Sequence, residues 1–187
     1  MSKKVLVPIA DGSEEIEAVC IIDVLRRAGA EVTVASVGPL KITASRGVKI
    51  EADRSIAECL GEQWDLVAVP GGIPGAEALH GSPDLSRILK RQQQEGKPYA
   101  AICAAPAVVL EPQGLLDGRK ATAHPGFADR LTNREAVEAR VVVDGNVVTS
   151  RGPGTAIEFA LALVSLLYGE EKAAEVAEPM LVRPFPS

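Results

Sequence analysis

The stretch "YAAICAAP" (residues 99–106) passes from an apolar run through one cysteine into small, helix-compatible residues. This pattern predicts a buried strand that ends at Cys103, a sharp turn and a helix that begins at once. On both sides of it, short β-branched runs alternate with helix-like segments along the chain. Such alternation is typical of parallel strands joined by crossover helices. We therefore expect an α/β fold with a mostly parallel sheet.

The other elements follow from apolar periodicity and turn residues. Predicted strands are "KVLVPIA" (4–10), "EVTVASV" (31–37), "WDLVAVPGG" (64–72) and a short one in "KATAHPG" (120–126) that ends at His124, with hairpins in 41–52 and in 139–154, the latter turning at Asp144-Gly145. Predicted helices are 12–30, with Ser13 as N-cap and Gly29 as stop, then about 84–95, 155–169, and a short helix in the Pro-terminated tail 170–187.

Composition limits the kind of protein and its partners. With 187 residues and 47% hydrophobic content, we expect one domain over residues 1–187 with a substantial core. The net charge of −5, with both signs interspersed, favours neither nucleic acid nor an anionic membrane surface as a partner. The start "MSKKVLVPIA" is too short for a secretory segment and lacks the features of a transit peptide, so it predicts a soluble, cytoplasmic protein.

Three widely spaced cysteines without a C-x-x-C pair indicate neither a disulfide framework nor a zinc site, and no metal is expected. Cys103 differs from the other two because it stands at the predicted strand-to-helix turn, where reactive groups of open parallel sheets gather. The helix dipole and nearby N–H groups there predict a thiol pKa below the usual value of about 8.5. The alternative is that Cys103 is a small buried hydrophobe. Cys20 and Cys59 lack this context and are interpreted as structural or incidental.

Glu17 is the second candidate. At 100° per residue it lies about 40° from Ile21 and about 20° from Val24, so it shares a helix face with apolar residues. Burial there would raise the carboxyl pKa and suit it to acid and base work near neutral pH. The alternative is that Glu17 extends to the surface. A second apolar strip, Ile16, Val19 and Cys20, is wider than one sheet contact requires and suggests a homodimer interface.

Two histidines and a few glycines and arginines complete the candidates. His124 is predicted on the side of the sheet where Cys103 lies, the alternative being a satisfied turn histidine, and His80 is interpreted as a surface residue in a loop. The amides of Gly71 and Gly72 could approach an oxyanion near the sulfur. Arg46 and Arg151 could bind an anionic substrate group or pair with carboxylates, and for Arg46 pairing is favoured.

Together, the motifs "DGSEEIEAV", "VPGG", "AAICAAP", "ATAHP" and "TSRGPGT", in this order and spacing, resemble the DJ-1 branch of the DJ-1/PfpI superfamily over nearly the whole chain. The resemblance implies a flavodoxin-like three-layer α/β sandwich that forms a homodimer. It further implies that Cys103 is an oxidation-prone nucleophile, Glu17 the protonated partner of its sulfur, and His124 the nearby imidazole. Gly72 and Ala104 match the oxyanion-hole amides of the family. "GLLDGRKAT" and "LVRP" are similar to plant and algal members, which carry a tandem pair of domains.

The resemblance also implies an activity. We expect cofactor-free conversion of a small 2-oxoaldehyde, methylglyoxal or glyoxal, to D-lactate or glycolate, or the related deglycation of aldehyde adducts. Metal, nucleotide and glutathione are not expected to take part. The alternative is a redox-sensing, chaperone-like protein that acts through oxidation of Cys103. Amidotransferase activity is not expected because no histidine follows His124, and peptidase activity loses support because Ala104, not histidine, follows the cysteine.

Overall fold

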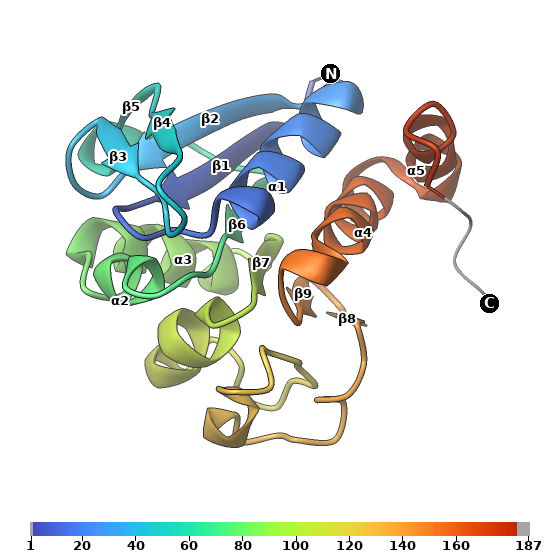
Figure 1. The fold of residues 1–187 in the computed structure, drawn as a ribbon. Coiled ribbons are helices and arrows are strands. Elements are labelled where there is room, and N and C mark those ends of the chain that lie inside the picture. The colour runs from blue at the N-terminus through green and yellow to red at the C-terminus, as the bar shows by residue number, and fades with distance from the viewer. Residues whose placement is uncertain (1, 183–187) are drawn as a thin grey trace.

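A computed structural model describes residues 2–182 and places a seven-stranded sheet at the centre of the fold (Figure 1). Its strands are β1 (Lys4–Ile9), β2 (Glu31–Ser36), β5 (Arg54–Ser55), β6 (Leu66–Val69), β7 (Tyr99–Ile102), β8 (Val141–Asp144) and β9 (Val147–Ser150). Their order is β5-β2-β1-β6-β7-β9-β8, and every pair is parallel except β8 with β9. A separate hairpin joins β3 (Lys41–Thr43) to β4 (Lys49–Glu51).

Helices cover both faces of the sheet. One face packs against α1 (Glu15–Arg27), α4 (Ala156–Tyr168) and α5 (Glu170–Ala177), and the other against α2 (Gly75–His80) and α3 (Pro83–Gln94) (Figure 1). Each face has its own apolar cluster, since alternate strand residues point in opposite directions. The prediction of a three-layer α/β sandwich with a mostly parallel sheet is therefore confirmed. No helix within residues 2–182 is long and apolar enough to cross a membrane.

The turn that contains Cys103 follows the buried central strand β7. All four residues of β6 and of β7 are buried, as is usual for parallel strands covered on both faces. Cys103 follows β7 directly with a left-handed φ of 66°, and a π-helical segment, Pro106–Leu110, begins three residues later. The predicted strand, turn and helix are confirmed, although the strand ends at Ile102 and the cysteine belongs to the turn.

The prediction of Ser13 as the N-cap of the first helix is wrong. Helix α1 begins at Glu15, and the carboxylate of Glu14 accepts the N–H of Ile16. The Ser13 hydroxyl instead accepts the N–H of Ala10 at 3.0 Å and closes the turn after β1. Serine is a typical N-cap and a carboxylate is favoured near a helix N-terminus, and the turn before the helix decides which of the two caps α1.

Two further differences concern residues 70–126. Residues 120–124 form no strand, because the N–H of Thr122 bonds the hydroxyl of Thr149 instead of a neighbouring backbone. Helix α2 was not predicted from the sequence, and His80 ends this helix instead of lying in a loop, although it is exposed as expected. Both hairpins, α4 and a short helix in the tail agree with the predictions. The prolines that close the tail lie outside the described residues.

Tyr99 gives a test of the packing below β7. Its hydroxyl is buried and donates to the carbonyl of Leu115 at 2.6 Å. Tyr99→Phe should lower the free energy of unfolding by about 1–3 kcal/mol, because that carbonyl loses its donor. Urea unfolding measures the change. Tyr168→Phe removes a hydroxyl that accepts a 3.3 Å bond from the N–H of Lys3 and should cost less; equal losses in the two variants would contradict this assignment.

Candidate active site

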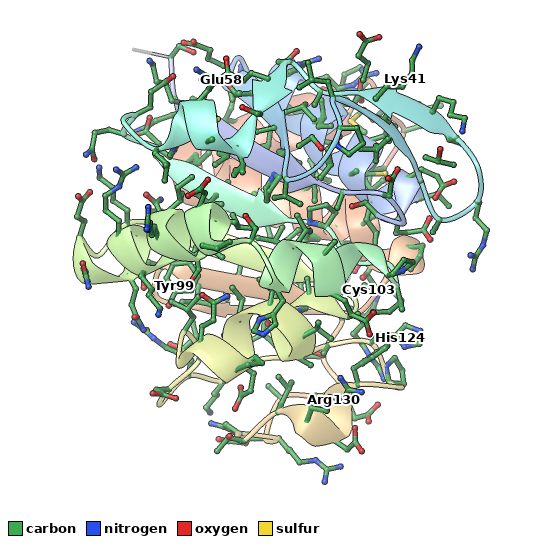
Figure 2. The ribbon with its side chains drawn as sticks, turned by 90° about the vertical axis from the view of Figure 1, so that its left-hand side faces the viewer. Lys41, Glu58, Tyr99, Cys103, His124 and Arg130 are labelled. Atoms are coloured by element: carbon green, nitrogen blue, oxygen red, sulfur yellow. The ribbon has the colours of Figure 1, made fainter. Side chains whose placement is uncertain are left out.

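A cavity of about 290 Å³ lies beyond the carboxyl ends of β6 and β7. Its lining consists of Glu14, Ser45, Arg46, Gly72, Ile73, Cys103, Ala104, His124, Phe127 and Pro153. Cys103 and His124 lie at the same end of the molecule (Figure 2). Adjacent parallel strands bring the turns that follow them to one edge of the sheet, where ligands of open α/β sheets bind. The residues that form the cavity are thus far apart in sequence and close in space.

Glu17 lies beneath this cavity on the inner face of α1 and is completely buried. Its Oε2 accepts the N–H of Gly71 at 2.8 Å, and its Oε1 has no hydrogen-bond partner by strict geometry among residues 2–182. A Cβ added to Gly71 would lie 2.6 Å from Cβ of Cys103 and 2.9 Å from Oε2 of Glu17. Gly71 therefore leaves the thiol and the carboxyl in direct reach of each other, and the predicted burial of Glu17 is confirmed.

The pKa values of this pair are both raised. Burial raises the pKa of Glu17 to about 7, with a further contribution from the charge of Glu14, while the N–H of Gly71 and the Cys103 thiol oppose the shift. Burial also raises the pKa of Cys103 to about 12, and the Glu17 carboxylate adds to it. Burial therefore disfavours the charged form of both groups, and the thiol and the carboxyl titrate together as a pair.

The raised pKa of Cys103 corrects the expectation of a lowered one. The backbone N–H groups of Gly72 and Ala104 do favour the thiolate, as the predicted helix start implied. Their effect is smaller than the cost of burying a charge beside a carboxylate. Burial thus favours the neutral thiol, and Glu17 is the base within reach of its proton. The predicted rise in the pKa of Glu17 is confirmed.

Of the two glycines proposed as oxyanion donors, the structure leaves one available. The N–H of Gly71 is engaged by Glu17, so it cannot also serve an oxyanion. The N–H groups of Gly72 and Ala104 instead reach the Cys103 sulfur. Gly72 has a φ of 90°, and a Cβ there would lie 2.5 Å from the N atom of Glu14. Only glycine fits at this close approach between the β6 turn and the start of α1.

Of the two candidate arginines, Arg46 lies in the cavity and Arg151 pairs with a carboxylate outside it. Arg151 forms an ion pair with Glu138, 3.3 Å between Nη1 and Oε2, and is not part of the cavity lining. Arg46 lines the cavity, and its guanidinium donates to the carbonyl of Ser45 instead of a carboxylate. Its backbone N–H donates to Glu15 at 2.8 Å. The hairpin that carries Arg46 folds onto the start of α1, a contact that no local pattern predicts.

Sequence reasoning also missed Glu14 and Ser45, which line the cavity. Ser45 Oγ lies 2.8 Å from a carboxylate oxygen of Glu14 and 2.8 Å from one of Glu15. Carboxylates in the first turn of a helix complement the helix dipole, so Glu14 and Glu15 gave no sign of a site in the sequence. Ile73, Phe127 and Pro153 complete the apolar part of the lining and carried no signal of their own. Across residues 2–182, no three His, Cys, Asp or Glu side chains are grouped in a way that could hold a metal ion.

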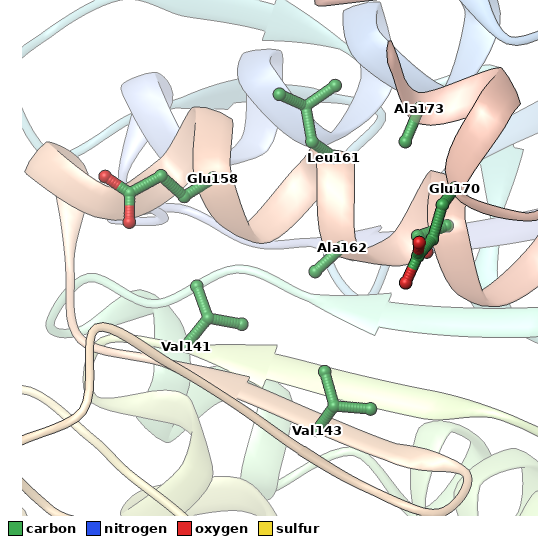
Figure 3. Close-up of a pocket in the computed structure, with 8 residues that line it drawn as sticks. Val141, Val143, Glu158, Leu161, Ala162, Glu170 and Ala173 are labelled. Atoms are coloured by element: carbon green, nitrogen blue, oxygen red, sulfur yellow. The ribbon is translucent and has the colours of Figure 1, made fainter. Parts of the chain in front are cut away.

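A second cavity, of about 350 Å³, lies between β8, α4 and α5 (Figure 3). Its lining is Val141, Val143, Glu158, Leu161, Ala162, Ser165, Glu170 and Ala173. It is the larger of the two, but it contains no thiol or imidazole, and Glu158 is already paired with Arg140. The chemistry of the protein is therefore assigned to the cavity at Cys103.

Fold and site together define an α/β protein of flavodoxin-like topology with a thiol–carboxyl pair at a strand-to-helix turn. Residues 3–166 match the model of the DJ-1/PfpI family. The chain belongs to the DJ-1/PfpI family. It is 54% identical over 180 residues to Protein DJ-1 homolog B of Arabidopsis thaliana. The matched region covers 96% of this chain and 41% of the plant protein.

Two other relatives are matched along nearly their whole length. The solved structure "Toxoplasma gondii DJ-1, oxidized" is 50% identical, has a TM-score of 0.96, and covers 98% of this chain and 100% of that one. Glutathione-independent glyoxalase DJR-1.2 of Caenorhabditis elegans is 34% identical over 181 residues, 96% of this chain and 95% of the worm protein. By contrast, the chain spans less than half the length of the Arabidopsis relative.

The raised pKa of Glu17 predicts a specific pH dependence of stability. The folded state binds this proton more tightly than the unfolded chain, so the stabilisation is complete below about pH 4.5 and is lost as pH rises through about 7. The loss should amount to about 3 kcal/mol. Glu17→Gln should remove this pH-dependent loss, which urea unfolding at about pH 5 and about pH 8 measures.

Exposed Glu51 provides the control for this experiment. Glu51→Gln should keep the pH dependence of the original protein, because a solvated carboxylate gains little from the fold. If Glu17→Gln also kept it, the burial of Glu17 as a titrating group would be refuted.

Proposed function

We propose that this protein is a glutathione-independent glyoxalase that converts small 2-oxoaldehydes, methylglyoxal or glyoxal, to D-lactate or glycolate. The observation that carries the proposal is the contact of Cys103 with Glu17 beneath two backbone N–H groups in a small cavity. At about 290 Å³ the cavity falls at the lower limit of ligand sites, which are commonly about 300–1,000 Å³. The relative named as a glyoxalase supports the same activity.

The first step uses the proton that the pair holds. Sγ of Cys103 adds to the aldehyde carbon as Glu17 takes the thiol proton, and the carbonyl electron pair moves to oxygen. The N–H groups of Gly72 and Ala104 stabilise the alkoxide that forms. Glu17 then returns the proton to this oxygen, which gives a neutral hemithioacetal and a carboxylate again.

The second step moves hydrogen between the two substrate carbons. The Glu17 carboxylate removes the proton from the sulfur-bearing carbon, and the C–H electrons form an enediolate whose charge lies on the second oxygen. Return of that proton to the second carbon, with transfer of the hydroxyl proton to the second oxygen, gives a thioester. Water attacks the thioester carbon, sulfur leaves with a proton, and the 2-hydroxy acid is released. Deglycation would use the same nucleophile on aldehyde adducts of amines.

D-Lactate formation from methylglyoxal without glutathione tests the proposal. Cys103→Ala should abolish it, since no nucleophile is left, and Glu17→Gln should lower kcat/KM by about 100-fold or more. In the original protein kcat/KM should fall below about pH 7, because protonated Glu17 cannot accept the thiol proton.

Cys20→Ala serves as the control and should retain activity, because Cys20 lies outside the cavity lining. Unchanged D-lactate formation in Cys103→Ala or in Glu17→Gln would remove that residue from the mechanism. No D-lactate from the original protein would refute the glyoxalase itself.

We further propose that two copies of the chain pair through α1. On this helix Ile16 and Val19 are 53% and 49% exposed, and Val48 of the hairpin is 49% exposed. The hairpin adjoins this helix, since the N–H of Arg46 donates to Glu15. An apolar patch of this kind favours a protein contact over solvent.

Sedimentation velocity at micromolar concentration tests this interface. The original chain should sediment as a dimer, and the double substitution Ile16→Ser with Val19→Ser should shift it to monomer by removing apolar contact area. Val143→Ser, which alters an exposed valine on the edge strand β8, should leave the dimer intact. A monomeric original chain would contradict the proposal.

The redox-sensing alternative has one observation in its favour, the oxidized form named for the Toxoplasma relative. We rank it second because oxidation follows thiolate character, and burial beside Glu17 raises the pKa of the Cys103 thiol. The predicted cytoplasmic location and the single domain stay predictions.

A further inference from the structure

A hydrogen bond to the imidazole of His124 determines which of its two ring nitrogens can donate. The N–H of Gly126 donates to its Nδ1 at 3.1 Å. A backbone amide always carries its hydrogen, so Nδ1 must present a lone pair to keep this bond. The neutral ring then carries its hydrogen on Nε2, because the bond at one ring nitrogen fixes the state of the other.

The turn that contains His124 is itself fixed by backbone bonds. The N–H of His124 donates to the carbonyl of Cys103 at 2.8 Å, and the N–H of Phe127 donates to the carbonyl of His124 at 2.8 Å. The ring also lies beside Gly152, where a Cβ would be 3.5 Å from Cδ2. With Nδ1 occupied by Gly126, Nε2–H is the polar atom that the ring can offer to a molecule in the cavity.

We propose that His124 acts as a neutral hydrogen-bond donor, through Nε2–H, to the second carbonyl oxygen of a 2-oxoaldehyde bound to Cys103. This role rests on the proposed glyoxalase function and specifies its substrate class: a carbonyl must stand next to the aldehyde. His124 does not remove the carbon-bound proton in this scheme; Glu17 does. As the enediolate forms, charge moves onto the second oxygen, and a fixed donor there stabilises it.

The different roles of Glu17 and His124 explain why two titratable side chains lie close to one thiol. The first alkoxide is met by the N–H groups of Gly72 and Ala104, which reach the sulfur. The second oxygen lies one carbon further from sulfur and needs a donor elsewhere on the cavity wall. His124 supplies one on the wall formed with Phe127 and Pro153. A neutral imidazole can serve because its donor does not have to be charged.

The tautomer can be tested on the free protein, without any assumption about activity. Two-bond ¹H–¹⁵N correlation spectra of the neutral ring should show the hydrogen of His124 on Nε2. His80→Asn assigns the signals, since only two histidines are present. A neutral ring with its hydrogen on Nδ1 would overturn the proposal even if the glyoxalase is real.

Turnover of methylglyoxal then tests the donor. His124→Ala should lower kcat by about 100-fold, the usual effect of losing one such donor, with little change in KM. His124→Gln places an amide N–H near the position of Nε2 and should recover most of the rate, whereas His124→Asn, whose amide reaches only as far as Nδ1, should not. If Gln were as inactive as Ala, a proton-accepting imidazole would be indicated and the donor role would fail.

A substrate with one carbonyl separates this proposal from the function on which it rests. Addition of the Cys103 thiol to propanal should proceed at the same rate in the original protein and in His124→Ala, measured as protection of the thiol from alkylation. Slower addition in His124→Ala would place His124 in the first step and refute the assignment. Absence of methylglyoxal turnover in the original protein, with the Nε2 tautomer present, would instead refute the glyoxalase.

Discussion

The site depends on one buried interaction, the bond from the N–H of Gly71 to the carboxyl of Glu17. It joins α1 to the turn after β6 and holds a titratable group where no solvent reaches it. Burial sets the pKa of that group near 7, so the carboxyl can change protonation state under ordinary conditions. A carboxyl in water would be ionised there and would be a weaker base.

The same interaction explains the glycines that follow β6. Gly71 lies between Glu17 and Cys103 with no room for a side chain, and Gly72 presses against the backbone at the start of α1. A larger residue at either position would separate the thiol from its base or push the helix away. Glycine is therefore required at positions 71 and 72 mainly because no side chain fits there. The oxyanion donor at Gly72 is a consequence of the resulting close approach.

The sequence sufficed for the parts of this structure that are local or periodic. The apolar runs of β6 and β7 predicted the central strands, and the position of Glu17 among apolar residues predicted its burial. It did not predict that Arg46 and Ser45 reach the cavity, because this depends on how a hairpin folds onto α1. Nor did it predict the raised pKa of Cys103, since a helix dipole and a buried carboxylate act in opposite directions and only distances decide between them.

The backbone of Cys103 links the sulfur to the rest of the site. A left-handed φ of 66° is unfavourable for a residue with a side chain, and it persists only where neighbours enforce it. Here the N–H of Cys103 donates to the carbonyl of Ser150 at 2.9 Å, and its carbonyl accepts the N–H of His124 at 2.8 Å. The strained turn is thus held from β9 on one side and from the His124 turn on the other. Sulfur and imidazole are consequently positioned by one run of backbone bonds, so that any movement of the His124 turn also acts on the residue that carries the nucleophile.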